Sequence, residues 1–199
     1  KALGIRQQSL PTNHPDLASS YNNIGNVYNS MGEYAKALSY YEKALGIRQQ
    51  SLPTNHPDLA GSYNNIGNVY GKMREYAKAL SYYEKALAIW QQSLPPNHPH
   101  LAGSYNNIGL VYDNMGEYAK ALSYYEKALA IRQQSLPPNH PDLAGSYNNI
   151  GLVYVNMGEY AKALSLCKRA VEIAKQSLPP NHPHLKFYKS NLDKVKNKL

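Results

Sequence analysis

The chain has 199 residues, of which 43% are hydrophobic and 17% charged, and it carries a net charge of +8. No apolar run approaches the roughly 20 residues of a membrane-spanning helix, and no basic, apolar leader opens the chain, so we expect neither a membrane location nor secretion. A single cysteine, Cys167, excludes a disulfide framework within the chain and favours a reducing, cytoplasmic location.

A unit of 42 residues is copied in tandem along the chain. The string SYNNIGNVY at 20–28 returns at 62–70, and SYNNIGLVY follows at 104–112 and 146–154. Self-similarity at such a period is typical of solenoid proteins. We therefore predict one solenoid domain over 1–199, composed of a half unit 1–17, full units 18–59, 60–101, 102–143 and 144–185, and a C-terminal capping helix 186–199.

The first ten residues match the end of a unit and lack its beginning. Lys1–Leu10 corresponds to Lys43–Leu52, which is the end of a second helix without its partner. We expect from this that the chain is part of a longer array. A helix without a partner could also be covered by a neighbouring molecule, so end-to-end self-assembly is one hypothesis for the function.

Each full unit contains two helical patterns separated by a glycine. In the first unit, apolar and small residues recur at steps of three and four, as on one face of a helix, at Tyr21, Ile24, Gly25, Tyr28 and Met31. Gly32 can reverse the chain. The same steps then continue at Tyr34, Ala37, Leu38, Tyr41, Ala44, Leu45 and Arg48.

A proline-rich loop ends each second helix and leads into the next first helix. Asn13, followed by Asp16 in the first turn, is predicted to cap the helix that begins there. Neither helix of a unit can bury its apolar stripe alone, so the units must stack into one continuous core. The fold class that follows is all-α.

The pattern Tyr21, Ile24, Gly25, Tyr28, Ala37, Tyr41 and Ala44 resembles the tetratricopeptide repeat. The 42-residue period, the NHPDLA loop and the segment Leu166–Ile173 are similar to the kinesin-light-chain type of this repeat. The resemblance implies a right-handed α-α superhelical solenoid of stacked antiparallel helix pairs. It also implies that the first helices line a concave groove and the second helices form the convex back, and that the protein binds other proteins.

Asparagines recur in every first helix, although asparagine is a poor residue in a helix interior. An asparagine amide can pair with both the N–H and the C=O of an extended peptide backbone. We therefore predict a peptide-binding groove formed by Asn22, Asn23, Asn26, Asn64, Asn65, Asn68, Asn106, Asn107, Asn148 and Asn149. The alternative is that these side chains satisfy a loop carbonyl or the end of a neighbouring helix.

The first helices also contain the positions that vary most between copies. One such position holds Asn26, Asn68, Leu110 and Leu152 in turn, so the groove would change from polar to apolar along the array, unless a solvent-exposed face has simply drifted. The resemblance aligns the second asparagine of each pair with an asparagine that, in some tetratricopeptide domains, helps to clamp the C-terminal carboxylate of a peptide. Its basic partners are replaced here by Ser19, Gly61, Gly103 and Gly145, so we do not expect such a clamp.

No residue pattern indicates catalysis, a metal or a cofactor, so we predict a protein that is not an enzyme. One histidine recurs in each loop, and successive loops are too far apart to share a metal ion, so a capping or solvated role is favoured for His14, His56, His98, His140 and His182. Cys167 occupies a core position and is expected to be a buried thiol. Trp90 replaces an arginine and is expected to be partly exposed.

The positive charge is concentrated in the last sixth of the chain. From Cys167 onward, eight Lys and Arg side chains stand against Glu172 and Asp193, which accounts for +6 of the +8. Nucleic-acid-binding proteins usually show a basic face along a whole element, so we do not expect a nucleic-acid partner, although binding of RNA through this end is a third hypothesis. The sequence predicts a protein or peptide partner.

Overall fold

The computed structural model describes residues 11–199, and every regular element in this range is an α-helix. Between Pro95 and Pro96 the chain divides into two compact parts, each of which is larger than one 42-residue repeat. From here on, the first and second unit mean these two parts, and the 42-residue segments are called repeats. The first unit contains α2 (Pro15–Ser30), α3 (Tyr34–Ser51), α4 (Pro57–Lys72) and α5 (Tyr76–Ser93). The second contains α6 (Pro99–Asn114), α7 (Tyr118–Ser135), α8 (Pro141–Asn156), α9 (Tyr160–Ser177) and α10 (Pro183–Lys196). The half repeat predicted for Lys1–Leu10 lies outside the described residues.

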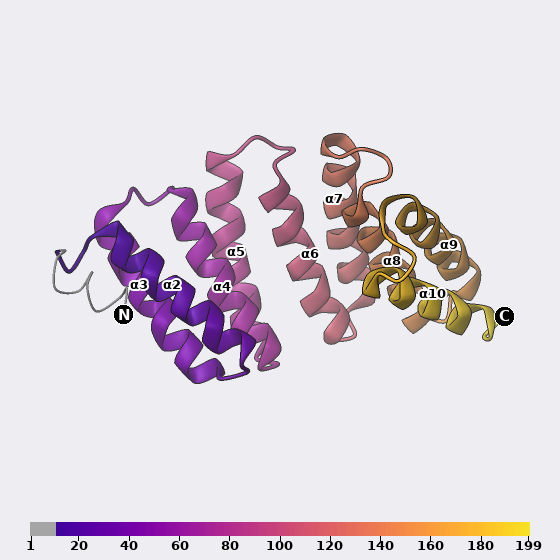
Figure 1. The fold of residues 1–199 in the computed structure, drawn as a ribbon, viewed down its shortest axis with the longest axis horizontal. Helices are drawn as coiled ribbons and strands as arrows, with labels where there is room; N and C mark the ends of the chain where they lie inside the picture. The colour runs from indigo at the N-terminus through magenta and orange to yellow at the C-terminus, as the bar shows by residue number, and fades with distance from the viewer. Residues whose placement is uncertain (1–10) are drawn as a thin grey trace. The chain divides into compact units, whose positions relative to one another are not determined.

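Within each unit, consecutive helices pair as antiparallel hairpins (Figure 1). In the first unit, α2 pairs with α3 and α4 pairs with α5, while α3 also packs against α4. In the second unit, α6 pairs with α7 and α8 pairs with α9, while α7 packs against α8 and α10 packs against α9. This arrangement confirms the prediction of an all-α fold built from stacked helix pairs.

The turn inside each pair requires one residue with a left-handed backbone. Gly32, Gly116 and Gly158 occupy this position with φ of 77°, 77° and 78°, and Arg74 occupies it with φ of 61° in the remaining pair. The residue that follows Gly32 closes the turn, because the backbone N–H of Glu33 donates to the carbonyl oxygen of Tyr28 at 2.9 Å. The predicted chain reversal at Gly32 is confirmed.

A histidine caps every first helix, and the prediction that Asn13 is the cap is wrong. The Nδ1 atom of His14 accepts a hydrogen bond from the backbone N–H of Asp16 at 3.2 Å. Pro15 is the first helical residue, and the residue before a proline is held in an extended conformation, so the capping position falls on His14 rather than one residue earlier. The same bond recurs at His56, His98, His140 and His182.

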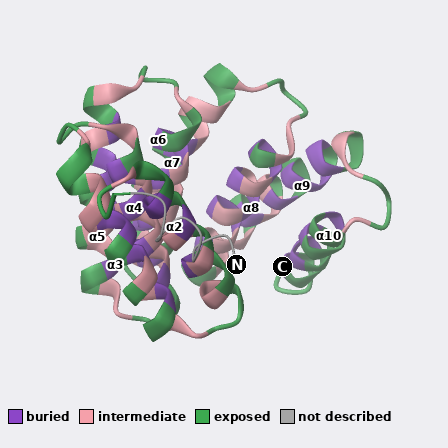
Figure 2. Cartoon of the chain, turned by 60° about the vertical axis from the view of Figure 1, so that its left-hand side comes forward, coloured by how far each residue is buried: buried purple, intermediate pink, exposed green. Residues whose placement is uncertain are grey.

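The pairs pack closely because a tyrosine ring of the second helix lies directly over a glycine of the first. A Cβ atom at Gly25 would lie 2.6 Å from the ring of Tyr41, and one at Gly67 would lie 2.8 Å from the ring of Tyr83. Buried residues therefore form stripes along the facing sides of the helices (Figure 2). In the first unit the core cluster consists of Ala37, Tyr41, Leu45, Leu59, Ile66 and Val69.

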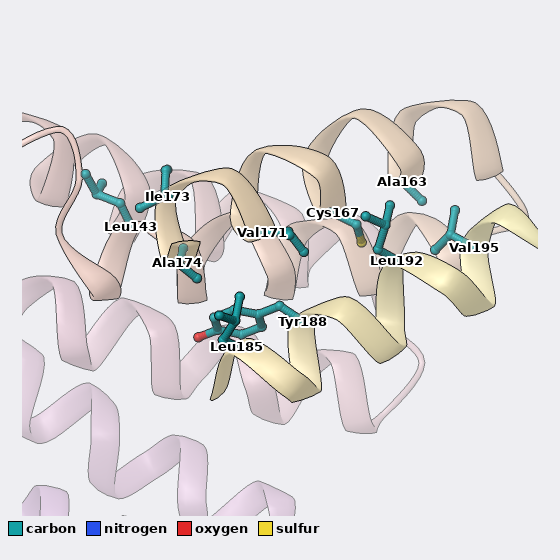
Figure 3. Close-up of a cluster of buried hydrophobic side chains, with 11 residues drawn as sticks. Leu143, Ala163, Cys167, Val171, Ile173, Ala174, Leu185, Tyr188, Leu192 and Val195 are labelled. Carbon is teal, nitrogen blue, oxygen red and sulfur yellow. The ribbon is translucent and has the colours of Figure 1, made fainter. Parts of the chain in front are cut away.

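The last helix, α10, covers the apolar side of α9 (Figure 3). Leu185, Tyr188, Leu192 and Val195 pack there, while the basic side chains of α10 remain exposed. Cys167 is fully buried in this cluster, and burial raises the pKa of its thiol, so the prediction of a buried thiol is confirmed. The prediction that Trp90 is partly exposed is wrong, since Trp90 is 5% exposed.

Candidate functional site

The first helix of the first pair presents a polar stripe at positions three and four residues apart. On α2 this stripe contains Asn22, Asn26 and Asn29, which share one side of the helix at 3.6 residues per turn. Gly25, which contacts the second helix, borders this stripe. Most of the asparagines that the sequence singles out belong to this face, which we call the first-helix face.

Asparagine side chains join neighbouring first helices by direct hydrogen bonds. In the first unit, the amide nitrogen of Asn65 on α4 donates to Asn22 Oδ1 on α2 at 2.9 Å. In the second unit, Asn149 on α8 donates in the same way to Asn106 on α6 at 3.1 Å. Each bond links the first asparagine of one pair to the second asparagine of the next pair, and we call it an asparagine bridge.

A third asparagine bridge involves a residue that the sequence analysis missed. Asn191 on α10 donates to Asn148 Oδ1 on α8 at 2.9 Å, and these two residues are 4% and 1% exposed. The signal was present in the sequence, because Ser190–Asn191 stands one repeat after the pair Asn148–Asn149. This bridge lies in the interior and is closed to a ligand, whereas the bridges of Asn22 and Asn106 are half-buried.

Each of the two accessible bridges leaves donors and acceptors for another molecule. Within the described part of the chain, Asn22 and Asn106 use their side-chain oxygens, and their amide nitrogens keep two donors each. Asn65 and Asn149 use their nitrogens and keep their oxygens. A donor and an acceptor therefore stand side by side at each bridge, as the backbone of an extended peptide requires.

The other predicted asparagines have different surroundings. Asn26 and Asn68 accept hydrogen bonds from the hydroxyls of Tyr41 and Tyr83 at 2.7 and 2.8 Å, so their oxygens hold the second helix in place. Asn23 is exposed, while Asn64 and Asn107 are half-buried.

In the second unit, leucine replaces the asparagine that bonds to tyrosine. Leu110 is 47% exposed, and Leu152 occupies the same position on α8 and is half-buried. Asp113 lies one turn beyond Leu110 and accepts a hydrogen bond from the side chain of Asn156 at 3.2 Å. Burial raises the pKa of the Asp113 carboxyl. The first-helix face of this unit thus combines apolar side chains, one carboxylate and one accessible asparagine bridge.

The first-helix face of the first unit is polar throughout. A second bond between helices lies one turn beyond Asn26, where Lys72 donates to Asn29 Oδ1 at 2.9 Å. Lys72 stands where the second unit has Asn114 and Asn156. Around Gly61 and Gly103 an added Cβ atom would meet nothing within 4 Å, so these glycines do not mark a close approach of backbones.

No group of three or more His, Cys, Asp or Glu side chains in residues 11–199 is arranged to hold a metal ion. Helices long and apolar enough to cross a membrane are likewise not found in this range. The arrangement therefore offers hydrogen bonds and apolar contacts, which are the means of binding another polypeptide.

Models of the tetratricopeptide repeat match residues 17–58, 58–134 and 143–184. The chain belongs to the tetratricopeptide repeat family. Arrays of this family are typically scaffolds for protein–protein interaction and are not enzymes. A search of curated protein sequences found no match.

Solved structures with the same fold include several proteins related to kinesin light chains. A putative kinesin light chain from Podospora anserina, described as having nearly identical tetratricopeptide-like repeats, has a TM-score of 0.78 and 22% identity over 93% of this chain and 88% of its own. BtubC (BKLC) from P. vanneervenii has a TM-score of 0.77 and 30% identity over 89% of this chain and 72% of its own. The apo form of RapI has a TM-score of 0.78 and 23% identity, over 91% and 63%.

Proposed function

We propose that the chain is an interaction scaffold that binds an extended segment of a partner protein on the first-helix face of the second unit. The observation that supports this proposal most directly is the set of donors and acceptors left unused at the bridge between Asn106 and Asn149. An extended backbone offers N–H and C=O groups in alternation, and one residue of the segment can accept from Asn106 Nδ2 and donate to Asn149 Oδ1.

Side chains beside this bridge select the segment. Leu110 and Leu152 provide an apolar surface next to it, and burying an apolar side chain there is favourable in proportion to the area removed from water. Asp113 is a partly buried carboxylate one turn away, and a cationic group of the partner would restore the solvation that burial removes. The segment that fits is therefore extended and carries an apolar residue next to Lys or Arg.

A substitution can remove the ligand-binding half of the bridge and keep the structural half. In Asn106→Asp, the side-chain oxygen still accepts from Asn149, but the amide donors are lost. Peptides selected from a random library on the wild-type chain should bind this variant about tenfold more weakly, which is the effect of losing roughly 1.4 kcal/mol of hydrogen bonding. Fluorescence anisotropy of the labelled peptides measures this loss.

A matched control separates binding from stability. Asn191→Ala removes an asparagine bridge of the same kind in the interior, so it should lower stability without changing peptide affinity. Leu110→Asn restores the polar residue of the first unit and should weaken binding as Asn106→Asp does. Peptides that bind Asn106→Asp and Leu110→Asn as well as the wild type would show that the site lies elsewhere.

A second candidate function is end-to-end self-assembly, and the exposed side of α2 favours it. Val27 is 58% exposed, whereas its counterparts Val69, Val111 and Val153 are at most 3% exposed. A second copy that covered this side would bury Val27 as the repeat buries the others. Sedimentation velocity of the wild type and of Val27→Lys across a concentration series tests this; a wild type that stays monomeric at the highest concentration would contradict it.

A cytoplasmic location stays a prediction from the sequence. The proposal needs only a compartment in which Cys167 remains reduced and buried.

A further inference from the structure

Three repeats contain the same trio of tyrosine rings, formed by two tyrosines of the first helix around one of the second. In the third repeat, the Tyr124 ring on α7 stacks on Tyr112 with centroids 5.5 Å apart and lies 6.2 Å from Tyr105. The second repeat has the same trio at Tyr63, Tyr70 and Tyr82, with distances of 6.2 and 5.5 Å. A lysine caps each trio, as Lys127 does at 5.1 Å from the Tyr124 centroid.

The fourth repeat lacks the central ring of this trio. Leu166 on α9 stands at the position of Tyr124, while Tyr147 and Tyr154 on α8 keep the outer positions. The capping lysine is replaced by Arg169, whose Nη1 atom lies 3.4 Å from Glu172 Oε2. Lys162 remains over the Tyr154 ring at 5.2 Å. Two outer rings thus remain where three repeats have a stack.

Hollows flank Leu166 on both sides. One has a volume of about 460 Å³, and its lining includes Tyr147, Leu166, Lys168, and the ion pair of Arg169 with Glu172. The other has a volume of about 340 Å³, with Tyr154, Leu166, Leu129 and Ile150 in its walls. Both volumes fall within the ~300–1,000 Å³ typical of ligand pockets. We call these two hollows together the Leu166 cleft.

The Leu166 cleft lies on the opposite side of α8 from the proposed peptide-binding face. Tyr147, Ile150 and Tyr154 are spaced by three and four residues and point into the cleft. At 3.6 residues per turn, Asn149 and Leu152 lie on the far side of the same helix. The cleft is therefore a separate site, and its argument does not depend on the first-helix face.

Charge at the cleft differs from that of the other repeats. Lys168 stands where the earlier repeats have Glu42, Glu84 and Glu126, and it has no ionic partner in the part of the chain that the structure describes. Arg169 retains the positive charge of the lysine it replaces. A carboxylate next to a ligand's aromatic ring would find Lys168 at the rim of the larger hollow.

We propose that the Leu166 cleft binds an aromatic side chain of a partner protein, with an acidic residue next to it in the partner's sequence. The partner's ring enters the larger hollow, where it packs against Tyr147 and Leu166 in place of the missing central ring. Lys168 pairs with the acidic neighbour. A second copy of this chain is a poorer occupant, because its exposed aromatic residue, Phe187, lies between Lys186 and Lys189 and would bring positive charge to a basic rim.

A short synthetic peptide with the sequence Gly-Asp-Tyr-Glu-Gly is the probe, and the methyl NMR signals of Leu166 in the full chain are the readout. We expect Gly-Asp-Tyr-Glu-Gly to shift these signals until the site is saturated. Gly-Asn-Tyr-Gln-Gly should bind with about tenfold lower affinity, and Gly-Asp-Ala-Glu-Gly should cause no shift. Equal binding of the tyrosine and alanine peptides would overturn the proposal.

Two substitutions restore the residues of the earlier repeats and should close the cleft. Leu166→Tyr supplies the missing ring and should abolish binding, read from the shifts of the Ile150 methyl signals. Lys168→Glu should weaken it about tenfold and reduce its dependence on salt. Both residues occur naturally at these positions in three repeats, so we expect both variants to fold. Unchanged affinity in Leu166→Tyr, or a loss of affinity in Asn106→Asp instead, would overturn the proposal.

The same exchange can be made in reverse. Tyr82→Leu together with Glu84→Lys gives the second repeat the residues that the fourth has at these two positions. This variant should bind two molecules of Gly-Asp-Tyr-Glu-Gly where the wild type binds one. A stoichiometry that stays at one would contradict the argument that the Leu166 exchange creates the site.

Discussion

The third and fourth repeats have nearly the same first helix and different second helices. Between Pro99–Asn114 and Pro141–Asn156, two positions differ: Asp142 replaces His100, and Val155 replaces Asp113. Between α7 and α9, by contrast, the second half of the helix is largely replaced, beginning with Leu166 and Cys167 for Tyr124 and Tyr125.

The two repeats therefore act as natural controls for each other. Almost identical first helices support two different second helices, so a difference in stability or binding between the repeats can be assigned to a small set of side chains on α7 and α9.

The largest expected effect comes from an arginine that α9 lacks. Arg132 on α7 donates from Nη1 to Ser146 Oγ at 2.7 Å, and burial lowers the pKa of its guanidinium, whereas the corresponding residue of α9 is Ala174. Arg132→Ala should lower the free energy of unfolding of the second unit by about 2–3 kcal/mol, because it removes a charged hydrogen bond from a partly buried serine. Pulsed labelling of the Cys167 thiol in urea measures this, since the thiol is buried until its surroundings open.

The first unit contains a matched control for this substitution. Arg48 donates to Ser62 Oγ at 2.7 Å, so Arg48→Ala makes the same change away from Cys167 and should leave the labelling of the thiol unchanged. An equal effect of both substitutions on the labelling would contradict the assignment of the effect to the second unit.

The glycine beneath the second helix gives the next comparison. A Cβ atom at Gly109 would lie 2.9 Å from the ring of Tyr125, and one at Gly151 would lie 2.9 Å from Cys167 Sγ. Gly109→Ala should lower the free energy of unfolding by about 1–2 kcal/mol, because the packed ring of Tyr125 has no room to move. Gly151→Ala should lower it less, because the single sulfur atom of Cys167 can rotate away. Chemical denaturation followed by circular dichroism tests the order. Gly103→Ala, where an added Cβ atom meets nothing, is the control and should be neutral or stabilising.

The tyrosine trio should have a measurable effect on stability as well as on binding. Leu166→Tyr restores the central ring and should stabilise the second unit by about 1 kcal/mol, the typical contribution of an aromatic pair beyond its buried area. Tyr82→Leu in the second repeat should have the opposite sign. Thermal melts of the two variants test this, and a Leu166→Tyr variant that melts below the wild type would show that the fourth repeat has adapted to leucine.

The smallest expected effect on stability comes from His100. This residue lies in the first turn of α6, where the fourth repeat has Asp142 in the first turn of α8. Partial burial, together with the neighbouring His98, lowers the pKa of His100. His100 is therefore harder to protonate in the folded state than in the unfolded state. The stability that neutral His100 contributes is fully present above about pH 6.5, the pKa of histidine in the unfolded chain, and is lost as the pH falls from there toward the lower pKa of the folded state. The loss between pH 7.5 and 5.5 should be a few tenths of a kcal/mol.

His100→Asp is the matched variant for this test, because the fourth repeat already has aspartate there. Its free energy of unfolding should fall less between pH 7.5 and 5.5 than that of the wild type, since a carboxyl titrates near pH 4 and lies outside this range. An identical fall in both proteins would show that His100 does not contribute.

The fold could be predicted from the sequence because the same helix-pair pattern recurs in each copy of the repeat. The chain reversal at Gly32 and the burial of Cys167 followed from spacing alone. The helix cap could not be placed correctly, because Asn13 and His14 both offer an acceptor and only the position of Pro15 in the helix decides between them. Trp90 was misjudged because its counterparts are arginines, and the burial of a repeat position changes with the side chain.

The candidate site was predictable in part. The sequence singles out the asparagines as unusual in a helix interior, but it cannot show that Asn22 and Asn65 bond to each other across 43 residues. This pairing depends on how neighbouring first helices lie. The Leu166 cleft was missed for another reason: the divergence of α9 was visible, but the loss of one ring matters only because Tyr147 and Tyr154 are retained on either side.

The asparagine bridge also bears on how such an array can change in length. Within each compact unit, the first asparagine of one copy accepts a hydrogen bond from the second asparagine of the following copy, so these joints between copies have the same form. Duplication or loss of one whole 42-residue repeat by unequal recombination would regenerate the joint without any new mutation. Asn191 shows that even the divergent last helix keeps the donating half of this joint.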